Sequence, residues 1–416
     1  MNTMVSVSEA LKHILDDVQP LPLEKVSLLK CLGRVLGEDI SASRNIPPRN
    51  NSAMDGYVIR SSDSLRAAPD TPVSLRVIGE IPAGVMPQKS LAPGETIQIM
   101  TGGILPLHGD AVVRREDVKR DGQWISIFSP YSPGYDVRMA GSDVRCGDVI
   151  ARKGQVLGAP EIGMLAAAGR SFVFVHQRPT VAIIATGNEL VDVDQEPSPG
   201  EIINVNGYGG AAQVSECGAI PLYLGIARDN KEDIARRFQD ASRADVILSS
   251  GGVSLGNYDF VKDVVVDSGN DLHFWQVAMS PGKPLAYGRL YGKVFFGLPG
   301  NPASSMISFE QFVRPALLKM MGHTLLFRRT VRAVVEENIE RKAGLTHFIR
   351  ARIERRDGCY RVVATGDPKT NILKSMVGVN GLIILPENVT CIKKGDKATI
   401  QLIDHSFCLT SEPHYL

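Results

Sequence analysis

The sequence predicts a multidomain α/β protein: a doubly wound α/β domain, a β-rich insertion domain, a small mixed N-terminal domain and a C-terminal β-barrel. Three observations support this. The chain has 416 residues, which is too long for a single hydrophobic core, so about two to four domains are expected. Strand and helix patterns alternate over residues 178–326. Short β patterns rich in proline and glycine fill 46–146, and further strand patterns fill 327–416.

The central segment, residues 178–326, carries the strand–helix alternation. Apolar runs typical of buried strands lie at 181–185, 220–226, 246–248, 272–277 and 293–297, and helical patterns lie at 206–217, 231–241, 258–266 and 303–321. Such alternation predicts a parallel, doubly wound sheet. Ligands of open α/β sheets bind beyond the carboxyl ends of the strands, so the residues that follow these strands are the candidates for a site.

The N-terminal segment predicts a domain that the chain leaves and later re-enters. Residues 6–38 are expected to form two helices, interrupted at Pro20-Leu21-Pro22. Residues 146–159 resemble a β-hairpin, and Pro160 is expected to start a short helix. These pieces, residues 1–45 with 147–177, would flank the β-rich domain of residues 46–146.

The C-terminal segment, residues 327–416, predicts a small β-barrel or sandwich. Alternating apolar and polar residues indicate strands at 330–339, 346–355, 359–364, 381–385 and 398–402. Asp357-Gly358 between two of these runs is typical of a hairpin turn.

The composition is that of a soluble globular protein. Lys plus Arg (46) nearly balance Asp plus Glu (45), so no strong field favours nucleic acid or an anionic membrane. No apolar run approaches the roughly 20 residues that span a bilayer, and the amphipathic N-terminal residues do not resemble a signal peptide. The six cysteines form no C-x-x-C pair, which argues against a disulfide framework or a zinc site. We therefore expect a cytoplasmic protein without a nucleic-acid or membrane partner.

The stretch from Val246 to Asp259 carries the first candidate site. A buried strand leads to a turn at Gly251-Gly252, where the lack of side chains lets backbone N–H groups approach a ligand. Asn257 and Asp259 would begin the next helix. A strand, a glycine turn and a helix N-terminus together bind phosphate well, and Asp259 would welcome a magnesium ion that accompanies the phosphate. An ordinary βα turn with a capping aspartate remains the alternative, with Ser250, Ser254 and Asn257 as turn formers.

Acidic residues follow three successive strands of the central segment. Glu189, Asp229 and Asp259 would converge on one edge of the sheet, where they repel one another unless a cation lies among them. Mg2+ that bridges nucleotide phosphates is the natural candidate, because it takes one or two carboxylates plus phosphate oxygens. A capping or surface role is the alternative for Glu189.

Two rigid glycine-proline turns follow later strands. Lys283, within Ser280-Pro281-Gly282-Lys283-Pro284, lies where a cation could meet an anion, or it is a solvated loop lysine. Common nucleotide-binding signatures are absent from the sequence. It contains no G-x-x-x-x-G-K-[ST] motif, which excludes a P-loop, and no G-x-G-x-x-G motif follows a strand, which argues against an NAD-type Rossmann site. Gly207-Tyr208-Gly209-Gly210 lacks the required spacing, and the eight histidines show no metal-ligand spacing.

Six motifs, in order along essentially the whole chain, resemble the molybdopterin molybdenumtransferase family (MoeA type, also found as the E domain of gephyrin). They are Asn51-Ser52-Ala53-Met54-Asp55-Gly56-Tyr57, Met100-Thr101-Gly102, Thr186-Gly187-Asn188-Glu189-Leu190, Ser249-Ser250-Gly251-Gly252-Val253-Ser254, Pro281-Gly282-Lys283-Pro284 and Gly297-Leu298-Pro299-Gly300-Asn301-Pro302. The resemblance implies four domains, the third with the MogA/MoaB fold, and a homodimer whose active sites lie between subunits. The implied reaction inserts molybdate into adenylylated molybdopterin and releases AMP with Mg2+ present.

The resemblance also implies roles for individual residues. Those that match the family's functional polar positions, together with the lysine, are Asp55, Thr101, Asp143, Glu189, Asp229, Asp259 and Lys283. Those expected to bind substrate are Ser250, Gly251, Gly252, Ser254, Pro299, Asn301, Pro302 and Arg350. Asp229 and Asp259 would hold Mg2+, and Lys283 with Arg350 would help to hold molybdate. The sequence departs from many relatives at Gln276 and Ser280, where a lysine is common.

The expected mechanism is electrostatic. Magnesium and backbone N–H groups would stabilise charge on the AMP phosphate while molybdate waits beside the pterin dithiolene. Other members of the biosynthetic machinery, or recipient apo-molybdoenzymes, are expected partners. A tungstate-inserting homologue, a scaffold that lost the chemistry and a hydrolase of free nucleotides are the alternatives. Retention of all the acids argues against the scaffold, and the additional β domains argue against the hydrolase.

Overall fold

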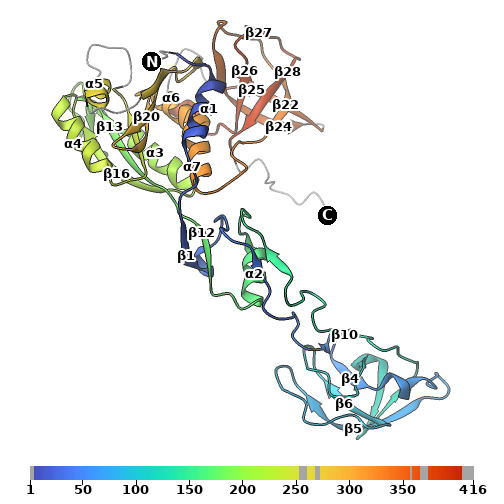
Figure 1. Ribbon diagram of the computed structural model, residues 1–416. Helices are drawn as coiled ribbons and strands as arrows, with labels where there is room; N and C mark the ends of the chain where they lie inside the picture. The colour runs from blue at the N-terminus through green and yellow to red at the C-terminus, as the bar shows by residue number, and fades with distance from the viewer. Residues whose placement is uncertain (1–3, 253–259, 268–271, 357, 366–372, 405–416) are drawn as a thin grey trace. The chain divides into compact units, whose positions relative to one another are not determined.

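The computed structural model describes residues 4–252, 260–267, 272–356, 358–365 and 373–404. The chain forms two compact units, one of Lys25–Val175 and one of Met1–Glu24 with His176–Leu416 (Figure 1). The expected multidomain α/β architecture is confirmed, whereas the finer division into four domains stays a prediction. No helix in the described ranges is long and apolar enough to cross a membrane.

A six-stranded sheet forms the centre of the larger unit, in the order β16-β13-β17-β21-β20-β18. Its strands are β13 (Thr180–Thr186), β16 (Ile220–Ala227), β17 (Val246–Ser250), β18 (Leu272–Gln276), β20 (Pro284–Leu290) and β21 (Lys293–Leu298). The first four strands in this order are parallel, and β20 runs antiparallel to both of its neighbours, β21 and β18. The prediction of a parallel sheet therefore holds for these four strands and was wrong for β20. It overlooked β20, which pairs with β21 through a two-residue turn at Tyr291 and Gly292, both with positive φ.

Helices cover both faces of this sheet, which confirms the doubly wound arrangement. Along β13, Val181 and Ile183 face one core and Ala182 and Ile184 face the other. The first core is shared with α1 (Val7–Asp17), α3 (Val205–Glu216), α6 (Pro302–Ser308), a π-helical turn (Phe309–Val313) and α7 (Arg314–Met320). The second is shared with α4 (Lys231–Ala241) and α5 (Phe260–Asp267).

Helix α1 is fixed to the sheet by an ionic network as well as by packing. Ser6 caps its N-terminus and accepts a hydrogen bond from the Glu9 amide. At its other end, Asp17 accepts a 2.6 Å hydrogen bond from Tyr287 Oη and forms a 2.9 Å ion pair with Arg289 Nη2. These polar contacts hold the C-terminal end of α1 to Tyr287 and Arg289 of strand β20.

The second N-terminal helix does not exist, so that prediction was wrong. Residues Leu23–Ser27 form strand β1, which pairs with β12 (Phe172–His176), and only a 3-10 turn (Leu28–Lys30) follows. Leu29 and Leu32, two apolar residues of this segment, are 96% and 64% exposed.

The expected hairpin at residues 146–159 is also wrong. Strand β11 (Val149–Ala151) pairs with the distant β2 (Ile40–Ser41) instead. Helix α2 (Ala159–Ala167) begins around Pro160 as expected, and Glu161 accepts a hydrogen bond from the Gly158 amide.

The smaller unit contains a six-stranded sheet in the order β7-β4-β6-β5-β9-β8. Its strands are β4 (Gly56–Ile59), β5 (Val73–Ile81), β6 (Glu95–Ile99), β7 (Ala111–Arg114), β8 (Val118–Asp121) and β9 (Trp124–Ile127), and β3 (Asn51–Ser52) pairs separately with β10 (Val137–Arg138). Tyr57 and Ile59 face one core and Val58 faces another, so both faces of this sheet are covered.

The C-terminal strands close into a five-stranded barrel, as expected. Its strands are β22 (Thr330–Val335), β24 (Thr346–Arg356), β25 (Cys359–Ala364), β26 (Gly381–Leu385) and β28 (Lys397–Leu402), and the pairing of β24 with β26 closes it. Arg356 and Cys359 pair across the hairpin, of whose turn Asp357 lies outside the described residues. Strand β19 (Met279–Ser280) pairs with β24 and so joins the α/β domain to the barrel.

Candidate active site

A cavity of about 590 Å3 opens at the carboxyl ends of the parallel strands. Strands β13, β16, β17 and β21 end there at Thr186, Ala227, Ser250 and Leu298. Eight of the residues selected from the sequence line it: Glu189, Asp229, Ser250, Gly251, Gly252, Pro299, Asn301 and Pro302. The turns that follow these four strands were expected to lie at one edge of the sheet, and in the structure they line one cavity.

The Gly251-Gly252 turn has a conformation that only glycine fits. The φ angles are +88° and +65°. A Cβ atom on Gly251 would lie 2.6 Å from Thr186 O, and one on Gly252 would lie 2.5 Å from a Val261 methyl carbon. The Gly251 amide donates a 3.1 Å hydrogen bond to Leu298 O, which ties the turn to the neighbouring strand. This tight backbone is suited to close approach by a phosphate.

Asp229 is held by the loop that contains Glu189. Asp229 Oδ2 accepts a 3.1 Å hydrogen bond from the Asn188 amide, and the Asp229 amide donates a 3.0 Å bond to Asn188 Oδ1. Arg228 donates to the carbonyl oxygens of Asn188 and Leu190. Because these contacts join the turns after β13 and β16, they place both acids on the same wall of the cavity.

Two of the predicted residues, Ser254 and Asp259, lie outside the described residues. Within the described ranges, no three His, Cys, Asp or Glu side chains are grouped so that they could hold a metal ion. Asp229 and Glu189 supply carboxylate oxygens of the kind that Mg2+ takes together with phosphate oxygens. The donor set therefore fits a magnesium ion that arrives with a phosphate-bearing ligand.

The starts of α3 and α6 also line this cavity, and of these only the α6 residues Asn301 and Pro302 were predicted from the sequence. Asn206 Nδ2 donates a 2.7 Å hydrogen bond to Gly300 O, which links these two elements. Asn204 and Asn301 cap their helices by accepting hydrogen bonds from backbone amides. The available signal was the pair of asparagines before a helical pattern, because asparagine is a preferred N-cap.

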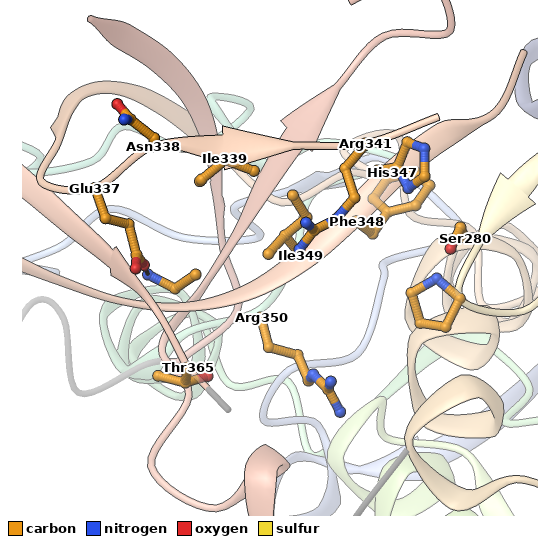
Figure 2. A pocket seen from close by; sticks show the side chains of 12 residues that line it. Ser280, Glu337, Asn338, Ile339, Arg341, His347, Phe348, Ile349, Arg350 and Thr365 are labelled. Atoms are coloured by element: carbon orange, nitrogen blue, oxygen red, sulfur yellow. Dashed lines mark hydrogen bonds between the residues drawn. The ribbon is translucent and has the colours of Figure 1, made fainter. Parts of the chain in front are cut away.

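A second cavity, of about 180 Å3, lies between the turn after β19 and the barrel. In Figure 2 the Arg350 side chain lies between Thr365 and Ser280, which line the same cavity. Arg350 is 7% exposed, and its Nη1 donates a 2.5 Å hydrogen bond to Ser375 Oγ. Burial lowers the pKa of Arg350 and also that of Arg341, which lines the same cavity. Arginine nevertheless remains charged in proteins, so this cavity suits an anion.

Lys283 lies within the turn that connects the two cavities. Ser280 and Pro281 line the smaller cavity and Pro284 lines the larger one. Lys283 itself is exposed, and its carbonyl oxygen accepts a 2.9 Å hydrogen bond from the Val277 amide. Its backbone is thus held while its side chain can move.

Asp55 and Thr101 come together in the unit of Lys25–Val175. Asp55 Oδ1 accepts hydrogen bonds of 2.7 Å from both the Thr101 amide and the Thr101 hydroxyl. Both hydrogen bonds lower the pKa of Asp55, and the bond from the backbone amide has the larger effect. Asp143, in the same unit, is exposed, and its amide donates to Ile46 O.

Comparison with known proteins gives matches over nearly the whole chain. Residues 5–169 match the MoeA N-terminal region (domain I and II), residues 182–319 match the probable molybdopterin binding domain, and residues 332–403 match the MoeA C-terminal region (domain IV). The molybdopterin molybdenumtransferase of a Nostoc species is 35% identical over 91% of this chain and 88% of its own length. The chain belongs to the molybdopterin molybdenumtransferase family. It is therefore an enzyme of molybdenum cofactor biosynthesis.

Other members of this family show the same extent of similarity. The molybdopterin molybdenumtransferase of Staphylococcus aureus strain COL is 33% identical over 96% of both chains. A crystal structure of the molybdopterin biosynthesis MoeA protein from Pyrococcus horikoshii is 31% identical, with a TM-score of 0.84, and covers 96% of this chain and 99% of its own. A Pyrococcus furiosus molybdenum cofactor biosynthesis protein, 23% identical with a TM-score of 0.58, shares the fold.

Proposed function

We propose that this protein inserts molybdate into adenylylated molybdopterin and releases AMP in a Mg2+-dependent step. The observation that carries the proposal is the turn of residues 280–284. One end of this turn lines the cavity beside the glycine turn, and the other end lines the cavity of the buried Arg350. A nucleotide phosphate and an oxyanion could therefore be held at the two ends of one short segment.

The larger cavity supplies the nucleotide end. The Gly251-Gly252 turn would receive a phosphate of the phosphoanhydride, while Asp229 would repel it unless a cation lay between them. Asp229, with Asp259, would hold Mg2+, and Glu189 would lie near the nucleotide. When bound, Mg2+ would neutralise charge that develops on the AMP phosphate as the bond breaks. Backbone N–H groups of the turn would orient the same phosphate.

The smaller cavity supplies the oxyanion end. Molybdate is a dianion, so a buried arginine and a nearby lysine match its charge. Arg350 is fixed by Ser375, whereas Lys283 is exposed and can move toward an arriving anion. Gln276, opposite Pro284 in the strand pairing, and Ser280 contribute hydrogen-bonding groups but no charge. Tungstate has the same charge and shape, so these contacts alone do not reject it.

The complete site is proposed to include a second subunit. Asp55 and Thr101 form a prepared polar pair in a different unit from the two cavities. A homodimer in which each subunit supplies this pair to its partner would complete two equivalent sites. We further propose that the enzyme works in the cytoplasm and passes its product to apo-molybdoenzymes.

An assay of AMP release tests this proposal against its alternatives. The purified protein is incubated with adenylylated molybdopterin and Mg2+, with molybdate, tungstate or neither. We expect AMP and molybdenum-loaded pterin to appear together when molybdate is supplied. A scaffold would release no AMP, and a tungstate enzyme would prefer tungstate at equal concentration. Cleavage of a free dinucleotide at a comparable rate would instead favour the hydrolase.

A further inference from the structure

Ser308, at the end of α6, has a fully buried hydroxyl group that lies against the turn of residues 280–284. Its exposed fraction is 0%. Its Oγ atom has no hydrogen-bond partner among the described residues. A Cβ atom placed on Gly282 would come within 2.4 Å of this Oγ atom, so the hydroxyl packs directly on the middle residue of the turn. Ser308 lines neither cavity.

The turn is fixed on both sides of Gly282. Ser280 pairs with His347 of the barrel, and the Lys283 carbonyl accepts a hydrogen bond from Val277. Gly282 has a φ of +101°, a conformation that favours glycine. Small changes in the backbone conformation of the turn are therefore expected at Gly282, next to the Ser308 hydroxyl.

An unpaired buried hydroxyl is unfavourable, and alanine would fill this position without that penalty. The side chain at position 308 therefore has a polar group where packing alone does not require one. A hydroxyl without a partner among the described residues can gain one when the adjacent backbone moves. The backbone that touches it is the segment on which Lys283 is carried.

We propose that Ser308 is a positioning residue for the oxyanion. When molybdate binds, the Pro281–Lys283 backbone accepts a hydrogen bond from Ser308 Oγ, and this bond holds the turn in the conformation that directs Lys283 to the anion. The inference rests on the proposed function and deepens it, because it assigns control of the oxyanion end to a residue outside both cavities. Ser308 acts through the turn and does not touch the substrate.

Kinetics of Ser308→Ala test this role. We expect the molybdate concentration for half-maximal insertion to rise by about two- to tenfold, the size of one net hydrogen bond. The kcat at saturating molybdate should stay within about twofold, because the bond affects how the anion is held, not the chemical step. Ser308→Thr, which keeps the hydroxyl, should restore the wild-type molybdate requirement. Titration calorimetry with sodium molybdate alone should show weaker binding to Ser308→Ala than to the wild type or to Ser308→Thr.

Ser249→Ala is a matched control. Ser249 is also 0% exposed, and its Oγ likewise has no hydrogen-bond partner in the described part of the chain, but it lies on β17 and lines neither cavity. Both alanine variants should unfold at or above the wild-type temperature, and only Ser308→Ala should require more molybdate. An unchanged molybdate requirement in Ser308→Ala, or an equal change in Ser249→Ala, would overturn the inference. If the wild-type enzyme neither bound nor used molybdate, the proposed function itself would fail instead.

Discussion

Asn188 and Asp229 hold each other through two reciprocal hydrogen bonds, of 3.1 Å from the Asn188 amide to Asp229 Oδ2 and of 3.0 Å from the Asp229 amide to Asn188 Oδ1. Asn188→Ala removes the second bond and leaves the first. We expect the KM for adenylylated molybdopterin to rise about two- to tenfold, as for one net hydrogen bond. Steady-state kinetics at saturating molybdate and Mg2+ measure this change.

Asn230→Ala is the control for that prediction. Asn230 caps α4 by accepting a 2.8 Å hydrogen bond from the Asp233 amide, so its loss should lower the free energy of unfolding by about 1 kcal/mol. The KM should stay at the wild-type value. An equal rise of KM in both variants would show that general loosening of the loop, not the contact to Asp229, sets substrate affinity.

The pH dependence of activity reports on Asp55 and Thr101. The two hydrogen bonds from Thr101 stabilise the charged carboxylate and so lower the pKa of Asp55. Thr101→Val removes the hydroxyl bond but keeps the amide bond, so the pKa should rise part of the way toward its ordinary value. The carboxylate would then be protonated at a higher pH, and the acid limb of the kcat/KM profile should move upward. An unmoved acid limb would mean that another group controls it.

The molybdate requirement should depend on the charges of the turn. Lys283→Ala removes a charge-assisted hydrogen bond, so the half-saturating molybdate concentration should rise about tenfold or more. Ser280→Lys adds a charge beside the Arg350 cavity and should lower that concentration. Neither change should alter the KM for the adenylylated pterin much, because Gly251 and Gly252 lie in the other cavity. Normal half-saturation in Lys283→Ala would assign the oxyanion to other groups.

Mixing two inactive variants tests whether the site lies between subunits. Asp55→Asn and Asp229→Asn should each be nearly inactive alone. In a site built from both subunits, each mixed dimer regains one intact site, so a reassorted equal mixture should recover about a quarter of wild-type activity. No recovery after confirmed subunit exchange would place both residues in the same site of one chain. Light scattering that showed a fully active monomer would contradict the dimer altogether.

Features set by local backbone geometry could be predicted from the sequence. Gly251 and Gly252 were selected because residues without side chains let backbone N–H groups approach a ligand, and the structure places both in a turn with positive φ. Asp229 and Glu189 were selected because parallel strands end at one edge, and both line the cavity there. These inferences need only the strand–helix period and the rules of parallel sheets.

Features set by distant contacts could not be predicted in the same way. The pairing of Ser280 with His347 puts the barrel beside the turn and creates the cavity around Arg350, yet nothing in either segment specifies this register. Strand β1 at Leu23–Ser27, where a helix was expected, is formed by pairing with β12, which lies far away in the sequence. The position of Ser308 against Gly282 also depends on how α6 packs, so no local pattern indicates it.

The coupling of AMP release to molybdate tests the central claim most directly. In a single-turnover experiment, excess enzyme is mixed with adenylylated molybdopterin and Mg2+, and AMP and molybdenum-loaded pterin are quantified over a range of molybdate concentrations. The account predicts that both products form in equal amounts and at the same rate, and that AMP release falls to background without molybdate. AMP release at the full rate without molybdate would contradict it, because the two cavities joined by the 280–284 turn would then not act on one coupled reaction.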